Sequence, residues 1–182
     1  MKAIVFLADG FEECEGLIVV DILRRAGVET VMASVMGRLE IVSSRGIRLK
    51  ADVLANDVDF DSVDMVILPG GRTGTENLSE SETVRGQCKS FATDKYVAAI
   101  CAAPSLLAEL GLLDGKNATC HPDFEGKMKG AVLTGNSVEK AGNIITGQGL
   151  GATMDFVLYI AEILAGKDTA DAIASSVCYR YR

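Results

Sequence analysis

The chain has 182 residues, 25 acidic and 18 basic, so its net charge is −7 with the lone histidine neutral. This length predicts one domain covering residues 1–182, since domains usually hold roughly 100–200 residues. An acidic chain lacks the clustered Lys and Arg that phosphate binding needs, and no apolar run is long enough to span a bilayer, so we expect neither a nucleic-acid partner nor a membrane partner.

The first half of the chain alternates β-rich runs with a helical pattern. Residues 2–8 and 64–68 are continuous apolar runs typical of strands buried on both faces, and residues 28–35 are β-rich as well. Apolar residues recur at helical spacing over 12–26, with Gly27 at the expected C-terminal position. Residues 41–54 alternate around a turn and predict a short hairpin on the flank of the sheet.

The second half repeats the scheme. Strands that alternate with helices predict βαβ units, so we expect an α/β fold with a mostly parallel sheet and helices on both faces. Ligands of such sheets bind beyond the carboxyl ends of the strands. The expected elements are a helix over 81–93, a strand over 96–100, a helix over 104–110, strands over 117–120 and 143–146, a helix over 153–164, and one or two helical turns over 168–176.

The most informative stretch is YVAAICAAPSLLAEL, residues 96–110. A buried strand runs into Cys101, and the next helix begins near Pro104, a residue favoured at the first helical position. The pattern is typical of a nucleophile elbow, in which a sharp strand-to-helix turn exposes a nucleophile. The helix N-terminus favours thiolate over thiol, so we expect a lowered pKa for Cys101. The alternative is that Cys101 is a small buried hydrophobe at the end of a core strand.

Four further residues fall at the expected carboxyl edge of the sheet. His121 is the single imidazole and follows a short strand. Glu12, Glu13 and Glu15 begin the first helix, where acidic residues ordinarily complement the helix dipole. Glu15 would differ if it pointed inward, because a desolvated carboxyl is protonated more readily and can donate a hydrogen bond to a thiolate.

Gly70 and Gly71 end a central strand, where glycine lets backbone N–H groups approach a ligand closely, as an oxyanion hole requires. The alternative is a plain turn. The five cysteines are irregularly spaced and never form CxxC, and no signal-peptide pattern opens the chain. We therefore expect reduced thiols, no metal site and a cytoplasmic protein, with Cys14, Cys88 and Cys120 structural unless Cys120 is a secondary oxidation site.

Several blocks of the sequence, in order, resemble the DJ-1/ThiJ/PfpI superfamily, specifically its DJ-1-like branch. The resemblance covers almost the whole chain. Its blocks are ADGFEECE (8–15), VDILRRAG (20–27), SRGI (44–47), VILPGG (66–71), NL (77–78), AAICAAP (98–104), HP (121–122) and the glycine-rich run from 149 to 156.

The resemblance implies a flavodoxin-like three-layer sandwich, usually a homodimer, with no cofactor. It implies that Cys101 is the reactive cysteine, that Glu15 is the acid bonded to its sulfur, and that His121 is a nearby general base. Gly71 and Ala102 would supply oxyanion-hole N–H groups. The implied activities are glyoxalase III or deglycase chemistry on methylglyoxal, glyoxal or a glycated adduct, and oxidative-stress protection through a Cys101 sulfinate or a chaperone role.

The chain departs from its relatives in three ways. Ala102 stands where the protease-like branch has His after its nucleophile, which disfavours peptidase chemistry. Ser43 and Lys50 stand where DJ-1 itself has its other cysteines. The additional C-terminal helix of animal DJ-1 has no counterpart in the pattern. An enzyme acting on 2-oxoaldehydes and a redox sensor or stress chaperone are the two leading hypotheses, and an amidotransferase-like role is a weaker third.

Overall fold

A twisted seven-stranded sheet forms the centre of the molecule, in a computed structural model that describes residues 1–180. The strand order is β10-β11-β7-β6-β1-β2-β5, and every pairing in it is parallel except that of β10 with β11. Its strands are β1 (Lys2–Leu7), β2 (Glu29–Ser34), β5 (Val53–Leu54), β6 (Met65–Leu68), β7 (Tyr96–Ile100), β10 (Val138–Ala141) and β11 (Ile144–Gly147).

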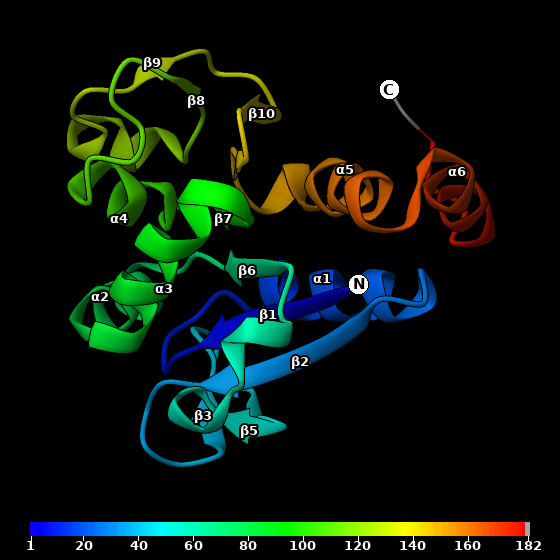
Figure 1. The fold of residues 1–182 in the computed structure, drawn as a ribbon, viewed down its shortest axis with the longest axis horizontal. Coiled ribbons are helices and arrows are strands. Elements are labelled where there is room, and N and C mark those ends of the chain that lie inside the picture. The colour runs from blue at the N-terminus through cyan, green and yellow to red at the C-terminus, as the bar shows by residue number, and fades with distance from the viewer. Residues whose placement is uncertain (181–182) are drawn as a thin grey trace.

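Helices cover both faces of this sheet, so the fold is the expected flavodoxin-like α/β sandwich (Figure 1). The helices are α1 (Glu13–Arg25), α2 (Arg72–Glu80), α3 (Glu82–Asp94), α4 (Pro104–Glu109), α5 (Thr153–Ala165) and α6 (Lys167–Ser176), with short 3-10 helices η1 (Ala55–Asp57), η2 (Phe60–Ser62), η3 (Pro122–Lys127) and η4 (Leu150–Ala152). Two small two-stranded sheets, β3 (Glu40–Val42) with β4 (Arg48–Lys50) and β8 (Asn117–Ala118) with β9 (Val132–Leu133), flank the main one.

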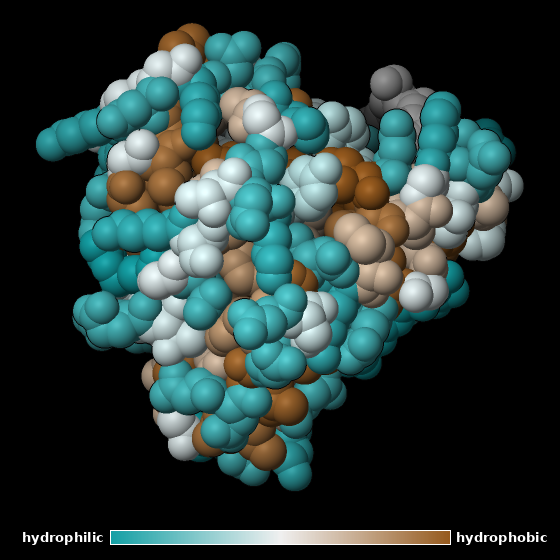
Figure 2. Space-filling view, viewed as in Figure 1, coloured by the Kyte–Doolittle hydropathy of each residue, from teal (hydrophilic) through white to brown (hydrophobic). Residues whose placement is uncertain are grey.

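Strand β1 shows why the central strands are apolar throughout. Val5 and Leu7 pack into the cluster formed with α1, α5 and α6, while Ile4 and Phe6 pack into the cluster formed with α2, α3 and α4. Successive side chains of a strand point to opposite faces, so a strand covered by helices on both sides needs apolar residues at every position. Hydrophilic residues cover most of the outer face seen in Figure 2, with apolar residues showing between them.

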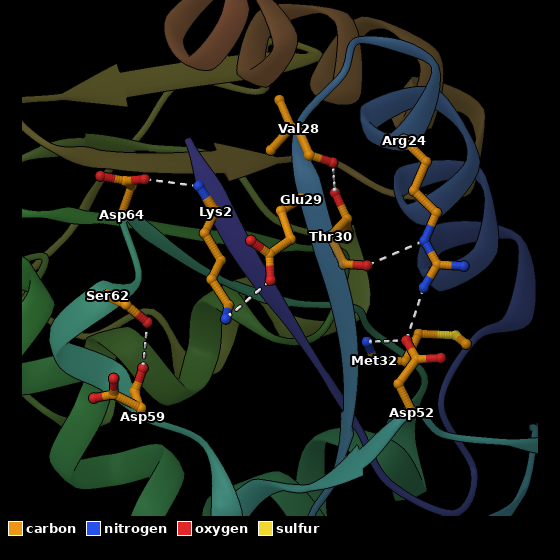
Figure 3. A network of polar contacts seen from close by, with 10 residues as sticks. All are labelled: Lys2, Arg24, Val28, Glu29, Thr30, Met32, Asp52, Asp59, Ser62 and Asp64. Carbon is orange, nitrogen blue, oxygen red and sulfur yellow. Dashed lines mark hydrogen bonds and ion pairs between the residues drawn. The ribbon is translucent and has the colours of Figure 1, made fainter.

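Polar residues fix the amino end of the sheet (Figure 3). The backbone N–H of Lys2 donates to Asp64 Oδ2 at 2.7 Å, and the Lys2 ammonium pairs with Glu29 at 3.0 Å. Arg24, near the end of α1, pairs with Asp52 at 2.7 Å. These contacts join strand starts and helix ends that are far apart in the sequence, so they set the register without entering the core.

Most expected elements are confirmed, and the differences have physical reasons. Helix α2 was not predicted, because its sequence RTGTENLSE contains few apolar residues and little helical periodicity. The expected strand over 117–120 is only two residues long and lies outside the central sheet. Strand β10 was missed because it is a half-exposed edge strand, and α6 is ten residues long rather than one or two turns. Within residues 1–180, every helix is too short or too polar to cross a membrane.

Candidate active site

Cys101 occupies a strained turn between β7 and α4. Its φ is +65°, and within residues 1–180 the other non-glycine residue with positive φ is Cys178. Two backbone hydrogen bonds hold the turn: Cys101 N donates to Gly147 O at 3.0 Å, and His121 N donates to Cys101 O at 2.9 Å. A left-handed conformation in a non-glycine residue costs energy and persists where the surroundings fix it, often at functional sites. The elbow predicted from the sequence is therefore present.

Glu15 reaches the same place from the first turn of α1. The residue is fully buried, and its Oε2 accepts a hydrogen bond from Gly70 N at 2.9 Å. The backbone N–H of Glu15 donates to the side chain of Glu12, which caps the helix. Burial raises the pKa of Glu15 to about 7, while the Cys101 thiol and Gly70 N–H lower it. Glu15 thus points inward, as the sequence left open, and can exchange a proton near neutral pH.

The Cys101 thiol does not have the lowered pKa predicted from its place at a helix N-terminus. Burial and the negative charge of Glu15 raise its pKa to about 12, although the backbone N–H groups of Gly71 and Ala102 favour the ionised sulfur. The prediction was wrong because it counted the helix dipole and left out desolvation beside a carboxylate, which here outweighs the dipole. A thiolate therefore needs somewhere for its proton to go.

The Glu15 carboxyl can take that proton. Glu15 Oε1 is buried and, within residues 1–180, lacks any hydrogen-bond partner of good geometry, while the carboxyl group interacts with the Cys101 thiol. Two groups coupled this closely titrate as a pair. When the pair carries one proton, moving it from sulfur to Glu15 removes the carboxylate charge that opposes thiolate formation. The thiolate then keeps its hydrogen bonds to the Gly71 and Ala102 N–H groups.

Gly70 and Gly71 have no room for a side chain. A Cβ on Gly70 would lie 2.6 Å from both Cys101 Cβ and Glu15 Oε2. Gly71 has a φ of +88°, and a Cβ there would lie 2.4 Å from Gly10 O. The close approach predicted for these glycines is present, and it brings the start of α2 against Cys101. A plain turn would not need this spacing.

His121 lies beside Cys101 through its backbone, but its imidazole is engaged elsewhere. Nδ1 accepts a hydrogen bond from Asp123 N at 3.2 Å, and 44% of the side chain is exposed. Because Nδ1 accepts this hydrogen bond, Nε2 is the ring nitrogen left to interact with a ligand. The structure gives no direct contact between the imidazole and the thiol, unlike the contact between Glu15 and Cys101.

Sequence reasoning missed the role of Glu13. This residue is 7% exposed, and Ser44 Oγ donates to its carboxylate at 3.0 Å. It therefore ties the loop after β3 to α1 next to Glu15, instead of merely complementing the helix dipole. The sequence contains one indication of this contact, because residues 44–46 (SRG) include polar side chains that need hydrogen-bond partners.

The remaining cysteines do not share this environment. Cys88 is a residue of α3 whose side chain is buried in the core, and burial raises its pKa to about 12. Cys120 is buried near His121, where burial and the charge of Glu125 raise its pKa to about 11. Cys14 is exposed as a residue, but partial desolvation of its thiol and the negative charges of the neighbouring glutamates raise its pKa. Cys101 differs from these thiols because the Glu15 carboxyl lies beside it as a proton acceptor and backbone N–H groups donate to its sulfur.

Comparison with known proteins gives the same architecture. The DJ-1/PfpI family model matches residues 1–163. Protein dj-1beta of Drosophila melanogaster is 36% identical over 99% of this chain and 98% of its own length, and the crystal structure of Drosophila DJ-1beta matches with a TM-score of 0.95. A structure of oxidised Toxoplasma gondii DJ-1 is 34% identical, covers 99% of both chains and has a TM-score of 0.94.

A further relative has an activity in its name. The glutathione-independent glyoxalase DJR-1.2 of Caenorhabditis elegans is 30% identical over 92% of this chain and 90% of its own length. The matches extend over nearly the whole chain, including the turn that carries Cys101 and the helix that carries Glu15. The chain belongs to the DJ-1/PfpI family.

Proposed function

We propose that the chain is a cofactor-independent enzyme of the glyoxalase III type, which converts methylglyoxal or glyoxal to the corresponding hydroxy acid, with related deglycase activity on glycated adducts. The observation that carries the proposal is the convergence of the Cys101 thiol, the Glu15 carboxyl and the Gly71 and Ala102 N–H groups at one strained turn. The name of the nematode relative supports the same activity class.

The first step is addition of sulfur to the aldehyde carbon. Glu15 takes the thiol proton, the Cys101 sulfur forms a bond to the carbonyl carbon, and the carbonyl π electrons move to oxygen. The N–H groups of Gly71 and Ala102 stabilise the negative oxygen, as in an oxyanion hole. Return of a proton to that oxygen gives a neutral hemithioacetal. Glu15 suits this work because a pKa of about 7 lets it accept and return a proton at neutral pH.

The second step moves hydrogen between adjacent carbons. A base removes the proton from the hemithioacetal carbon to give an enediol, and reprotonation at the neighbouring carbon gives a thioester. Water then adds to the thioester, and the thiol leaves with release of the hydroxy acid. No external oxidant or reductant is needed, because one carbon is oxidised and its neighbour reduced. Glu15 serves as the base, and His121, whose Nδ1 accepts a hydrogen bond from Asp123 N, serves as a donor through Nε2.

The assembly proposed for the chain is a homodimer, as the resemblance implies, and the proposed location is the cytoplasm, as the cysteine usage predicts. Light scattering on the purified protein tests the dimer, with a mass of twice 19.2 kDa expected.

A second candidate function is sensing of peroxide, and the Cys101–Glu15 contact favours it specifically. One hydrogen peroxide oxidises the thiol to sulfenic acid with release of water, and a second oxidises the sulfenic acid to sulfinic acid, again with release of water; loss of a proton then gives the sulfinate. A protonated Glu15 would donate a hydrogen bond to a sulfinate oxygen. Mass spectrometry after mild peroxide treatment separates the two functions: selective gain of two oxygens at Cys101, with negligible turnover of aldehydes, favours sensing.

Production of lactate from methylglyoxal tests the enzymatic proposal. The wild-type protein is expected to form lactate without glutathione, and Cys101→Ser is expected to lose at least about a thousandfold of kcat/KM, as loss of a covalent nucleophile does. Cys178→Ser is the matched control, because Cys178 also has positive φ but is exposed. Full turnover by Cys101→Ser would show that the covalent scheme is wrong.

A further inference from the structure

A hollow of about 800 Å³ lies between α2, α4 and η3. Helices α2 and α4 lie on the same side of the sheet (Figure 1). Cys101, Glu15 and His121 do not line it. Its volume falls in the range of small-molecule sites, about 300–1,000 Å³. Leu106 and Ala108 of α4 and Phe124 of η3 give it an apolar wall, and each is at most 6% exposed.

Two cations are fixed against this apolar wall by the Phe124 ring. The Arg72 guanidinium carbon lies 5.0 Å from the ring centroid, and Lys127 Nζ lies 5.3 Å from it. Contact with an aromatic face holds a cation without neutralising its charge. The rim of the hollow therefore has two positive groups that are positioned and still charged.

The hollow has a surplus of positive charge. Arg72, Lys127 and Lys129 line it, and within residues 1–180 none of them has a carboxylate at ion-pair distance. On the acidic side, Glu109 is paired with Arg85 at 2.7 Å, which leaves Glu76 and Asp114. Within residues 1–180 the hollow thus has three cations and two carboxylates outside ion pairs, although the chain as a whole has a net charge of −7.

An unpaired buried hydroxyl also borders the hollow. Thr75 is 5% exposed, and its Oγ1 is buried with no hydrogen-bond partner within residues 1–180. Buried hydroxyls are nearly always bonded, so an orphan beside a cavity is a place where a ligand atom would be satisfied. The small motion needed to reach it would come from α2, a helix with few apolar anchors.

We propose that this hollow binds a small organic anion, with an apolar body against Leu106 and Phe124 and one carboxylate, sulfonate or phosphate group between Arg72 and Lys127. An apolar wall with a few converging polar groups is the usual composition of a small-molecule site. A compact inorganic anion would leave the apolar wall uncovered, and an uncharged molecule would leave the cations unpaired.

The probe for the test is anilinonaphthalene sulfonate, a fluorescent anion with an aromatic body. The wild-type protein is expected to bind one equivalent, with affinity that falls as salt rises. Lys127→Gln removes one cation and is expected to weaken binding about three- to fivefold, the effect of one exposed charge. Lys89→Gln is the matched control, since Lys89 is an exposed lysine of α3 that does not line the hollow, and it should bind as wild type does.

A second pair of variants separates this hollow from the rest of the molecule. Ser79→Trp, on the α2 wall, fills part of the hollow and should weaken binding at least tenfold, whereas Cys101→Ser should leave binding unchanged. Near-UV circular dichroism of each variant shows that the dye reports a folded site rather than a loosened core. The proposal is overturned if Lys127→Gln and Ser79→Trp bind the dye as the wild type does, or if Cys101→Ser abolishes binding.

Discussion

The two ends of the central sheet differ in how their polar residues are exposed and hydrogen-bonded. At the amino end, the Lys2 backbone N–H donates to Asp64 and the Lys2 ammonium pairs with Glu29, through contacts that are partly exposed (Figure 3). At the carboxyl end, Glu15 is fully buried, and its Oε1 has no hydrogen-bond partner of good geometry within residues 1–180; Cys101 is held in a strained conformation. The same parallel strands therefore have exposed, satisfied polar contacts at one end and a buried acid beside a strained cysteine at the other.

The difference indicates which end does chemistry. Exposed ion pairs contribute little and need no special environment. A buried carboxyl and a cysteine in the left-handed backbone region both lower the stability of the folded protein. Proteins usually keep such unfavourable features only at positions where function requires them. Changes at the carboxyl end should therefore alter activity strongly, and changes at the amino end should alter only stability, and slightly.

The largest expected effect is on turnover. Glu15→Gln keeps the shape of the side chain but removes the group that accepts the thiol proton. We expect kcat/KM for methylglyoxal to fall about a thousandfold, or about 4 kcal/mol, within the range of general acid–base catalysis. The measurement is lactate formation at neutral pH. A loss of less than about fivefold would show that Cys101 ionises without help from Glu15.

The pH dependence of stability should carry the next largest effect. Unfolded Glu15 ionises near 4.5, whereas the folded protein keeps its proton up to about 7. Between these values the native state binds more protons, so this contribution is fully present below pH 4.5 and is lost as pH rises through 7. The free energy of unfolding of the wild type should fall by roughly 3 kcal/mol relative to Glu15→Gln across this window. Urea titrations at several pH values measure it, and parallel curves would contradict the buried acid.

Crowding the site should give a smaller loss. Gly70→Ala places a Cβ 2.6 Å from Cys101 Cβ and from Glu15 Oε2, so we expect about 1–3 kcal/mol of destabilisation and weakened turnover. Gly86→Ala is the control, because a Cβ on this α3 glycine meets open space and should raise helix stability by about 0.5–1 kcal/mol. Equal effects of the two substitutions on melting would contradict the close packing at Gly70.

The smallest effect is expected at the amino end. Lys2→Gln removes the ion pair with Glu29, whose side chain is 65% exposed. The free energy of unfolding should change by less than about 1 kcal/mol, and the rate of lactate formation should be unchanged. A loss of turnover here would erase the contrast between the two ends of the sheet.

The sequence predicts the fold well because its buried strands are apolar on both faces and its helices have clear ends. The residues 64–68 and 96–100 become β6 and β7, and the helix over 12–26 becomes α1 within one residue at each end. Helix α2 and strand β10 lack this periodicity. Their places depend on contacts with the Gly10 loop and with β11, which no local pattern records.

The candidate site could be predicted in part. The positions of Cys101 and Ala102 follow from a strand, a turn and a helix start that are adjacent in the sequence, and the position of Gly71 follows from the glycine pair that ends another central strand. The inward orientation of Glu15, 86 positions away, depends on how α1 packs, and so does the desolvation that raises both pKa values. No local pattern predicts the hydrogen bond from Asp123 N to the His121 imidazole. This bond forms at the start of a 3-10 helix, after a strand that is only two residues long.

The account depends most on proton sharing between Cys101 and Glu15, and the pH dependence of Cys101 alkylation by iodoacetamide tests it directly. Peptide mass spectrometry follows this thiol separately from the other four. In the wild type we predict reactivity that rises with an inflection near pH 7, the pKa of the buried acid, and that Glu15→Gln removes this inflection. If Cys101 instead resists alkylation until strongly alkaline pH, and Glu15→Gln leaves its rate unchanged, proton sharing is contradicted.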